Sequence, residues 1–278
     1  MIRALIKKRA RRFYWQILSN FSFEYEKDDL KRRTIVFSPH FDDETLGCGG
    51  TILKKRKAGA DVKIVFMTDG SKSHTHLMSE EDSKVIRRGE GLAACRSLGL
   101  NIADVFFLDF EETKLREHLD SAIHRVKKIL NEVHPEEVFI PYSKEPLLWS
   151  EDHLATTKIV KSGLRLYNKK VIIYEYPIWF WCHWPWAKIT LRRRREIFRH
   201  LKNHSFIRGI NLLWDFRCRV GIGDILDLKQ NALKQHKSQM TRFRGDPRWR
   251  ILADVSNGEF LSCFFQEYEL FHKYIFKI

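Results

Sequence analysis

Short apolar runs alternate with longer amphipathic stretches from residue 34 to residue 177. Runs rich in β-branched and aromatic residues, which are typical of buried strands, occupy residues 34–37, 62–67, 105–108, 138–140 and 171–174. Stretches with helical periodicity lie between them, at about residues 44–57, 80–98, 115–133 and 152–164. Strands that alternate with helices predict an α/β fold, in which a mostly parallel sheet carries helices on both faces.

The alternation fades after Pro177. Residues 178–278 are rich in tryptophan, phenylalanine and arginine, and no linker or internal repeat sets them apart. A chain of 278 residues with 44% hydrophobic content can bury one sizeable core. We therefore expect a single domain over residues 33–278, with its core at 33–177 and a C-terminal elaboration at 178–278 that closes over the site. Residues 1–32 form a basic N-terminal extension in this scheme.

The chain is strongly basic, with a formal net charge of +15. Such a surface favours an anionic partner, and nucleic acid, anionic lipid and a phosphorylated substrate all qualify. No recognisable nucleic-acid-binding module occurs, so we expect no nucleic-acid partner. Residues 1–12 contain six basic residues and no acid, interleaved with apolar residues. Two interpretations stay open for residues 1–20: an amphipathic helix on a membrane surface, or a solvated helix packed on the domain.

Location signals are weak in this sequence. It contains no apolar run of about 18 residues or more, and no signal-peptide core followed by a cleavage site. The five cysteines are widely spaced and form no C-x-x-C pair, which is typical of buried thiols in a reducing compartment. We therefore expect a cytoplasmic protein, peripheral at the inner face of the membrane if residues 1–20 bind lipid.

The segment Pro39-His40-Phe41-Asp42-Asp43-Glu44 follows the first predicted strand. A histidine and a carboxylate three residues apart on a tight turn can point at one spot, and both are good zinc ligands. A catalytic zinc needs three protein ligands and an open position for water. We therefore predict that His40 and Asp43 bind zinc, and that Asp42 faces the water as general base.

A third ligand is expected after the fourth predicted strand. His153 lies there at the start of a helix, at the same edge of the parallel sheet as His40. Asp152 beside it could orient a ligand or a catalytic group. Taken singly, an acidic turn is usually a solvated loop and a lone histidine a surface residue. Together, at the ends of two strands of one sheet, they favour a metal site.

These residues resemble the LmbE-like N-deacetylase (PIG-L) family, whose hallmark is a Pro-His-x-Asp-Asp-Glu turn after the first strand. Further matches follow in order within residues 33–240: Thr68-Asp69-Gly70, Arg87-x-x-Glu90 with Ala94 and Leu98-Gly99, Asp152-His153, Tyr174-Glu175-Tyr176, and a Lys229-x-x-Ala232-x-x-x-His236-x-Ser238-Gln239 segment. The first motif is fairly specific, and the ordered set is much more so. The resemblance implies a Rossmann-like fold, one Zn²⁺ or another divalent metal per chain, and hydrolysis of an N-acyl amide, often of N-acetylglucosamine.

One departure concerns Ser150, which stands where the family usually has a histidine. The resemblance gives that histidine a role in stabilising the oxyanion or protonating the leaving amine. Serine can donate a hydrogen bond but carries no proton to give near neutral pH, so Ser150 is a catalytic candidate with reduced chemistry. His236 is a candidate for the missing role by residue type, and with Arg87 it is a candidate substrate-binding residue. The plainer interpretation of Arg87 is an ion pair with Glu90 or Asp69.

Several functions fit these observations. The first is removal of an N-acetyl group from an N-acetylglucosamine-type sugar in a glycan, glycolipid or nucleotide-sugar acceptor, which can be phosphorylated, during assembly of a surface glycan. The alternatives are an amidase acting on a sugar–thiol conjugate or another small N-acyl compound, and a non-catalytic binding protein with a degenerate site. Tryptophans at 179–186 could stack on sugars, lie at a membrane interface, or simply pack on the domain.

Overall fold

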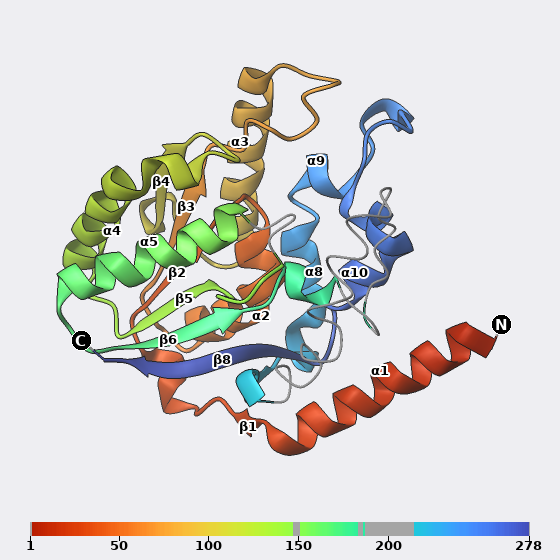
Figure 1. The fold of residues 1–278 in the computed structure, drawn as a ribbon, viewed down its shortest axis with the longest axis horizontal. Helices are drawn as coiled ribbons and strands as arrows, with labels where there is room; N and C mark the ends of the chain where they lie inside the picture. Colours follow the sequence, from red (N-terminus) through yellow and green to blue (C-terminus); the bar gives the residue numbers. More distant parts are fainter. Residues whose placement is uncertain (1, 147–150, 183–185, 187–213, 278) are drawn as a thin grey trace.

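The protein is built on one eight-stranded sheet, seen in a computed structural model that describes residues 2–146, 151–182, 186 and 214–277 (Figure 1). The strand order is β1-β7-β8-β6-β5-β2-β3-β4. Five neighbouring strands, which reach from β6 to the edge at β4, are parallel: β2 (Thr34–Ser38), β3 (Val62–Thr68), β4 (Val105–Phe110), β5 (Glu137–Pro141) and β6 (Val171–Tyr176). These are the strands that the apolar runs predict, each extended by one or two residues.

Helices cover both faces of this sheet, as Figure 1 shows. One face is covered by α4 (Leu119–Val133) and α5 (Glu151–Tyr167), which pack against Ile35 and Phe37 of β2. The opposite face is covered by α2 (Asp43–Lys57), α3 (Glu80–Ser97) and α8 (Leu226–Leu233), which share a core with Val36. Successive residues of β2 thus face opposite layers, because side chains alternate along a strand. The predicted α/β fold, with helices on both faces, is confirmed.

The C-terminal elaboration completes the sheet beside β6. Strand β8 (Tyr268–Phe276) pairs antiparallel with both β6 and β7 (Cys218–Gly221). The shorter helices of this region and of the loops are α9 (Lys237–Met240), α10 (Glu259–Ser262) and 3-10 turns at Asp28–Lys31, Ile102–Asp104, Leu115–His118, Trp179–Trp181, Gly223–Ile225, Phe243–Gly245 and Leu252–Gly258. The C-terminal strands β7 and β8 are therefore part of the same sheet as the parallel strands.

The N-terminal residues begin with helix α1 (Ile2–Phe21), which extends away from the sheet in Figure 1. Strand β1 (Phe23–Glu24) then pairs with β7, and Leu18 and Tyr25 are buried in the core. Part of residues 1–32, which we expected to form a separate extension, thus packs with the domain. The sequence did not predict this contact because β7, the strand that pairs with β1, comes from the distant C-terminal region. No helix among the described residues is long and apolar enough to cross a membrane.

Helix α2, which begins at the predicted site, is packed unusually closely. A Cβ built on Gly50 would lie 2.5 Å from Ile222, and one on Gly47 would lie 2.4 Å from Tyr176. Two ionic side chains also contact the α2 backbone: Glu269 accepts hydrogen bonds from the N–H groups of Gly50 and Thr51, and Lys229 donates to the carbonyl of Leu46. The glycines of α2 leave room for these neighbours to approach, and the neighbours then hold the helix in place.

We predict that Gly50→Ala destabilises the protein by about 1–3 kcal/mol, because the new methyl group overlaps Ile222 in a closely packed interior. Gly89→Ala on α3 is the matched control, since a Cβ there meets nothing within 4 Å and alanine favours a helix by roughly 0.5–1 kcal/mol. Thermal and urea unfolding of the two variants measure the difference. Equal stability of both would contradict the close approach at Gly50.

Candidate active site

A cavity of about 450 Å³ opens at the carboxyl ends of the parallel strands, the edge where α/β sheets bind ligands. Its polar lining is dominated by acidic side chains, with one arginine and one histidine. The charged and titratable lining residues are His40, Asp42, Asp43, Arg87, Glu112, Glu151 and Asp152. Apolar side chains complete the wall, among them Leu46, Ile178, Trp179, Leu252 and Phe260.

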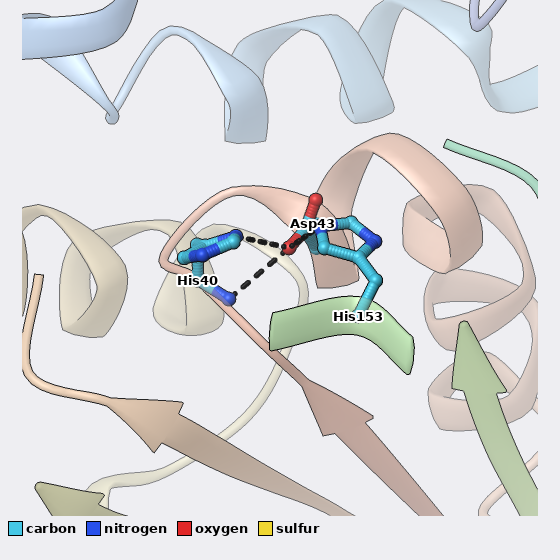
Figure 2. A group of neighbouring side chains, drawn as sticks. All are labelled: His40, Asp43 and His153. Carbon is cyan, nitrogen blue, oxygen red and sulfur yellow. Dashed lines mark hydrogen bonds and ion pairs between the residues drawn. The ribbon is translucent and has the colours of Figure 1, made fainter. Parts of the chain in front are cut away.

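The three predicted ligands point toward one another (Figure 2). His40 comes from the turn after β2, Asp43 begins α2, and His153 lies in the first turn of α5. Asp43 Oδ2 lies 3.2 Å from His40 Nδ1 and 3.2 Å from His153 Nε2. The N-terminal end of α2 favours a carboxylate at this point, because the helix dipole is positive there.

The donor set fits a divalent metal. Ligand atoms bound to zinc at about 2.0–2.2 Å in a tetrahedron lie roughly 3.3–3.6 Å from one another. Asp43 Oδ2 lies 3.2 Å from a nitrogen of each histidine, and the three ligand atoms all lie within 4.8 Å of one another. Within the described part of the chain, neither ring nitrogen of the buried His153 has a well-aligned hydrogen bond, although each lies near a carboxylate. Two imidazoles and one carboxylate are the ligand number of a catalytic zinc site, and His40 and Asp43 of this set line the cavity.

Each histidine also has a second carboxylate behind it. His40 Nε2 lies 3.2 Å from Asp152 Oδ2, and His153 Nδ1 lies 3.1 Å from Glu145 Oε2. Asp152 is held in turn by the backbone N–H groups of Thr113 and Leu115. Carboxylates in this position fix the ring orientation and the tautomer of metal-binding histidines.

The carboxylates around the two histidines raise the pKa of both rings. Burial favours the neutral ring, but the nearby Asp152 and Asp43 carboxylates outweigh it and raise the pKa of His40 well above its ordinary value. For His153, burial is likewise outweighed by Asp43 and Glu145, which raise its pKa to about 9. The carboxylates of the site therefore stabilise positive charge on the two histidine rings. A bound divalent cation would balance the same carboxylates and would displace the protons from the ring nitrogens.

Asp42 adopts a strained backbone conformation beside these residues. Its φ is +131°, which is rare for a residue with a side chain and recurs at functional sites. Arg87 Nη2 lies 3.6 Å from Asp42 Oδ2 and donates a hydrogen bond to the carbonyl of Phe41. Burial raises the pKa of Asp42 to about 7, with Arg87 opposing the shift. A carboxyl group with such a pKa can exchange a proton near neutral pH.

Glu44 and His236 hold the backbone of the turn that contains Asp42. Glu44 Oε2 accepts a hydrogen bond from the backbone N–H of Asp42 at 3.0 Å, and Glu44 Oε1 lies 3.1 Å from His236 Nε2. Both side chains are fully buried. Burial is outweighed by their mutual attraction, so the pKa of Glu44 is lowered and that of His236 is raised. His236 does not line the cavity, which places it behind Asp42 rather than against a substrate.

Other predicted residues have mixed outcomes. Arg87 lines the cavity, but its expected ion pair with Glu90 or Asp69 is wrong. It contacts Asp42 and Glu112, whereas Asp69 pairs with Lys84 and Glu90 accepts hydrogen bonds from Ser238. The turn of the chain after β4 brings Glu112 closer than the helical neighbours of Arg87. Ser150 lies outside the described residues.

Sequence reasoning missed Glu112 and Glu145, although a signal was available. Glu112 follows β4 and Glu145 follows β5, so both stand at the same strand ends that identified His40 and His153. No local pattern identifies Phe260, which comes from α10 and stacks on Trp179 in the cavity wall with ring centroids 5.1 Å apart. Trp181 and Trp186 instead pack with Trp15 of α1, as the simple packing interpretation predicts.

Two histidines and a carboxylate at an open cavity, with further carboxylates beside them, are the side chains of a metal-dependent hydrolase site. The family model PIG-L, described as GlcNAc-PI de-N-acetylase, matches residues 35–163. A diacetylchitobiose deacetylase from Thermococcus kodakarensis is 24% identical over 232 residues, which cover 80% of this chain and 76% of that protein. A probable N-acetyl-α-D-glucosaminyl L-malate deacetylase 2 from Bacillus cereus is 29% identical over 227 residues, covering 80% of this chain and 90% of that protein.

A solved structure shares the fold as well. The N,N′-diacetylchitobiose deacetylase from Pyrococcus horikoshii has a TM-score of 0.58 at 22% identity, over 87% of this chain and 84% of that chain. Residues 35–163 thus form a PIG-L, or LmbE-like, domain, and the protein is an enzyme of the hydrolase class. The resemblance seen in the sequence motifs is confirmed.

We predict that His236→Ala destabilises the protein by about 3 kcal/mol or more, because it leaves the fully buried Glu44 without its partner. Adding Glu44→Gln to this variant should recover part of the loss, since the uncompensated charge is then absent. Asp224→Ala, which breaks an exposed ion pair with Lys54, is the control and should change the melting temperature little. Additive losses in the double variant would show that the pair is not coupled.

Proposed function

We propose that this enzyme is a zinc-dependent hydrolase that removes the N-acetyl group of an N-acetylglucosamine-type sugar within a glycan, glycolipid or nucleotide-sugar acceptor. The observation that carries the proposal is the convergence of His40, Asp43 and His153 at a cavity that Asp42 also lines. The names of the two relatives described above support the substrate class, because each is a deacetylase of an N-acetylated glucosamine compound.

In this proposal the metal is held by His40, Asp43 and His153. When bound, a divalent metal supplies Lewis acidity toward the amide carbonyl and toward water. Asp42 takes a proton from the attacking water, and Arg87 and Glu44 keep its carboxylate and backbone in position. Asp152 orients His40, and Glu145 orients His153. Iron or cobalt could occupy the same ligand set.

The leaving amine requires a proton, and its donor is a separate part of the proposal. Ser150 is proposed to donate a hydrogen bond to the carbonyl oxygen, which a hydroxyl group can do without changing its charge. Once Asp42 has accepted a proton from water, it can pass that proton to the amine, so the same carboxyl group acts first as base and then as acid. His236 is proposed to act only through Glu44, as a positioning residue.

The charge of the cavity limits which acceptor molecules can bind there. Carboxylates outnumber cationic side chains in its lining, so a phosphate group would be repelled there. We therefore propose that the sugar entering the cavity is uncharged at its reacting end, and that any phosphate of the acceptor stays outside, toward the basic exterior. Trp179 and Phe260 offer an apolar wall against which a sugar face can pack. The five buried free cysteines support the expected cytoplasmic location.

Two further candidates remain. The same donor set would serve an amidase of small N-acyl compounds, and replacement of the family histidine by Ser150 would suit a binding protein that has lost catalysis. An acetate-release assay separates the three. We expect zinc-dependent release from N-acetylglucosamine, its oligosaccharides or a glycolipid, with loss of activity on chelation and recovery on adding zinc. Release only from non-sugar amides favours the amidase, and binding without release favours the non-catalytic protein.

We predict different losses for Asp42→Asn and His153→Ala. Asp42→Asn should keep the metal and lower turnover by roughly 10²–10⁴-fold, because an amide cannot accept a proton from water. His153→Ala should lose the metal itself, since one of three ligands is removed. Metal analysis by mass spectrometry and the acetate assay measure the two effects. Asp224→Ala is the control for both, and full metal occupancy in His153→Ala would refute the ligand assignment.

A further inference from the structure

Helix α1 presents two different faces. The face toward the domain carries Lys7, Arg11, Tyr14, Trp15 and Leu18, at the three- and four-residue spacing of one side of a helix. The other face carries the exposed residues Leu5, Ile6, Lys8, Arg9, Arg12 and Phe13. The helix contains no acidic residue at all. The first face explains how α1 is held, whereas the second is exposed within the described part of the chain.

The inner face fixes α1 against the C-terminal elaboration. Trp15 packs edge-on against Trp186 at 4.9 Å and against Tyr268 at 5.2 Å, and Leu18 is fully buried. Lys7 and Arg11 both form ion pairs with Glu259, at 2.5 Å and 2.9 Å. The helix is therefore docked along one side, and its outer side has a defined orientation relative to the enzyme.

The outer face combines apolar and basic side chains. Leu5, Ile6 and Phe13 are 53%, 54% and 61% exposed, which is unusual for large apolar residues that lie on one helix face. Lys8, Arg9 and Arg12 are exposed among and beside them. The N-terminal end of α1 also projects away from the sheet (Figure 1).

We propose that the outer face of α1 docks on the surface of an anionic lipid bilayer. Apolar side chains flanked by basic ones insert into the headgroup region while their charges attract anionic headgroups. Charge complementarity favours lipid over a second copy of the chain, because pairing two such faces would bring Lys8, Arg9 and Arg12 against their own copies. The helix lies on the surface, as a helix this rich in charge does not cross a membrane.

Docking through α1 would place the active-site cavity near the lipid. Glu259, which anchors Lys7 and Arg11, is the first residue of α10, and the next residue, Phe260, lines the cavity. The wall of the cavity is thus attached directly to the lipid-facing helix. This surface goes beyond the proposed function and does not rest on it, since lipid binding can be measured without any substrate.

The test is cosedimentation of the full chain with vesicles of phosphatidylcholine and phosphatidylglycerol, and with vesicles of phosphatidylcholine alone. We expect binding to the mixed vesicles that weakens at high salt. The double variant Leu5→Ser with Phe13→Ser should bind at least about tenfold more weakly, because it loses the burial of two apolar side chains. The triple variant Lys8→Gln, Arg9→Gln and Arg12→Gln should lose the preference for anionic vesicles.

The control is Val85→Ser with Ile102→Ser, which removes two apolar side chains that are 66% and 58% exposed on other elements. It should bind vesicles as the unaltered chain does. Melting temperatures and light scattering accompany every variant. Absence of binding to mixed vesicles, or equal binding by the Leu5/Phe13 variant, overturns the proposal. A change of oligomeric state in that variant without a change in lipid binding assigns the face to self-association and overturns it too.

Discussion

One carboxylate, Asp43, organises the site of this protein. It lies within 3.2 Å of a ring nitrogen of both His40 and His153, which come from different strand ends of the parallel sheet. Each histidine ring lies between Asp43 and a second carboxylate, which favours positive charge on the ring or on a bound cation, and the pKa of both histidines is raised accordingly. The parallel sheet brings the two strand ends together, and Asp43 is the residue that contacts the histidines from both.

The C-terminal elaboration supports this site from behind. Lys229 and Glu269 contact the backbone of α2, while His236 pairs with Glu44, whose carboxylate holds the backbone of Asp42. A backbone conformation as strained as that of Asp42 persists only where its surroundings determine it. The distant motif that contains Lys229 and His236 therefore has a mechanical explanation: it fixes the first two turns of α2 and the residue that precedes them.

Charge is divided between the interior of the site and the exterior of the chain. The cavity lining is rich in carboxylates, whereas the chain as a whole carries a formal charge of +15. We propose different partners for the two signs, because an acidic cavity suits a cation and an uncharged sugar, and a basic helix suits an anionic surface. The net charge by itself does not choose between a phosphorylated substrate and an anionic surface, whereas the placement of the charges supports this division.

The sequence by itself determined the order of strands and helices between residues 34 and 177, the turn that carries His40, Asp42 and Asp43, and the family resemblance. Apolar periodicity and the spacing of ligands on one turn are local, and a helix after the fourth strand must start at the same sheet edge. Only the tertiary structure decided the partners of Arg87, the buried place of His236, the contribution of Glu145 and Phe260, and the joining of β1 to β7. Each of these depends on contacts between residues far apart in the chain, which no local pattern encodes.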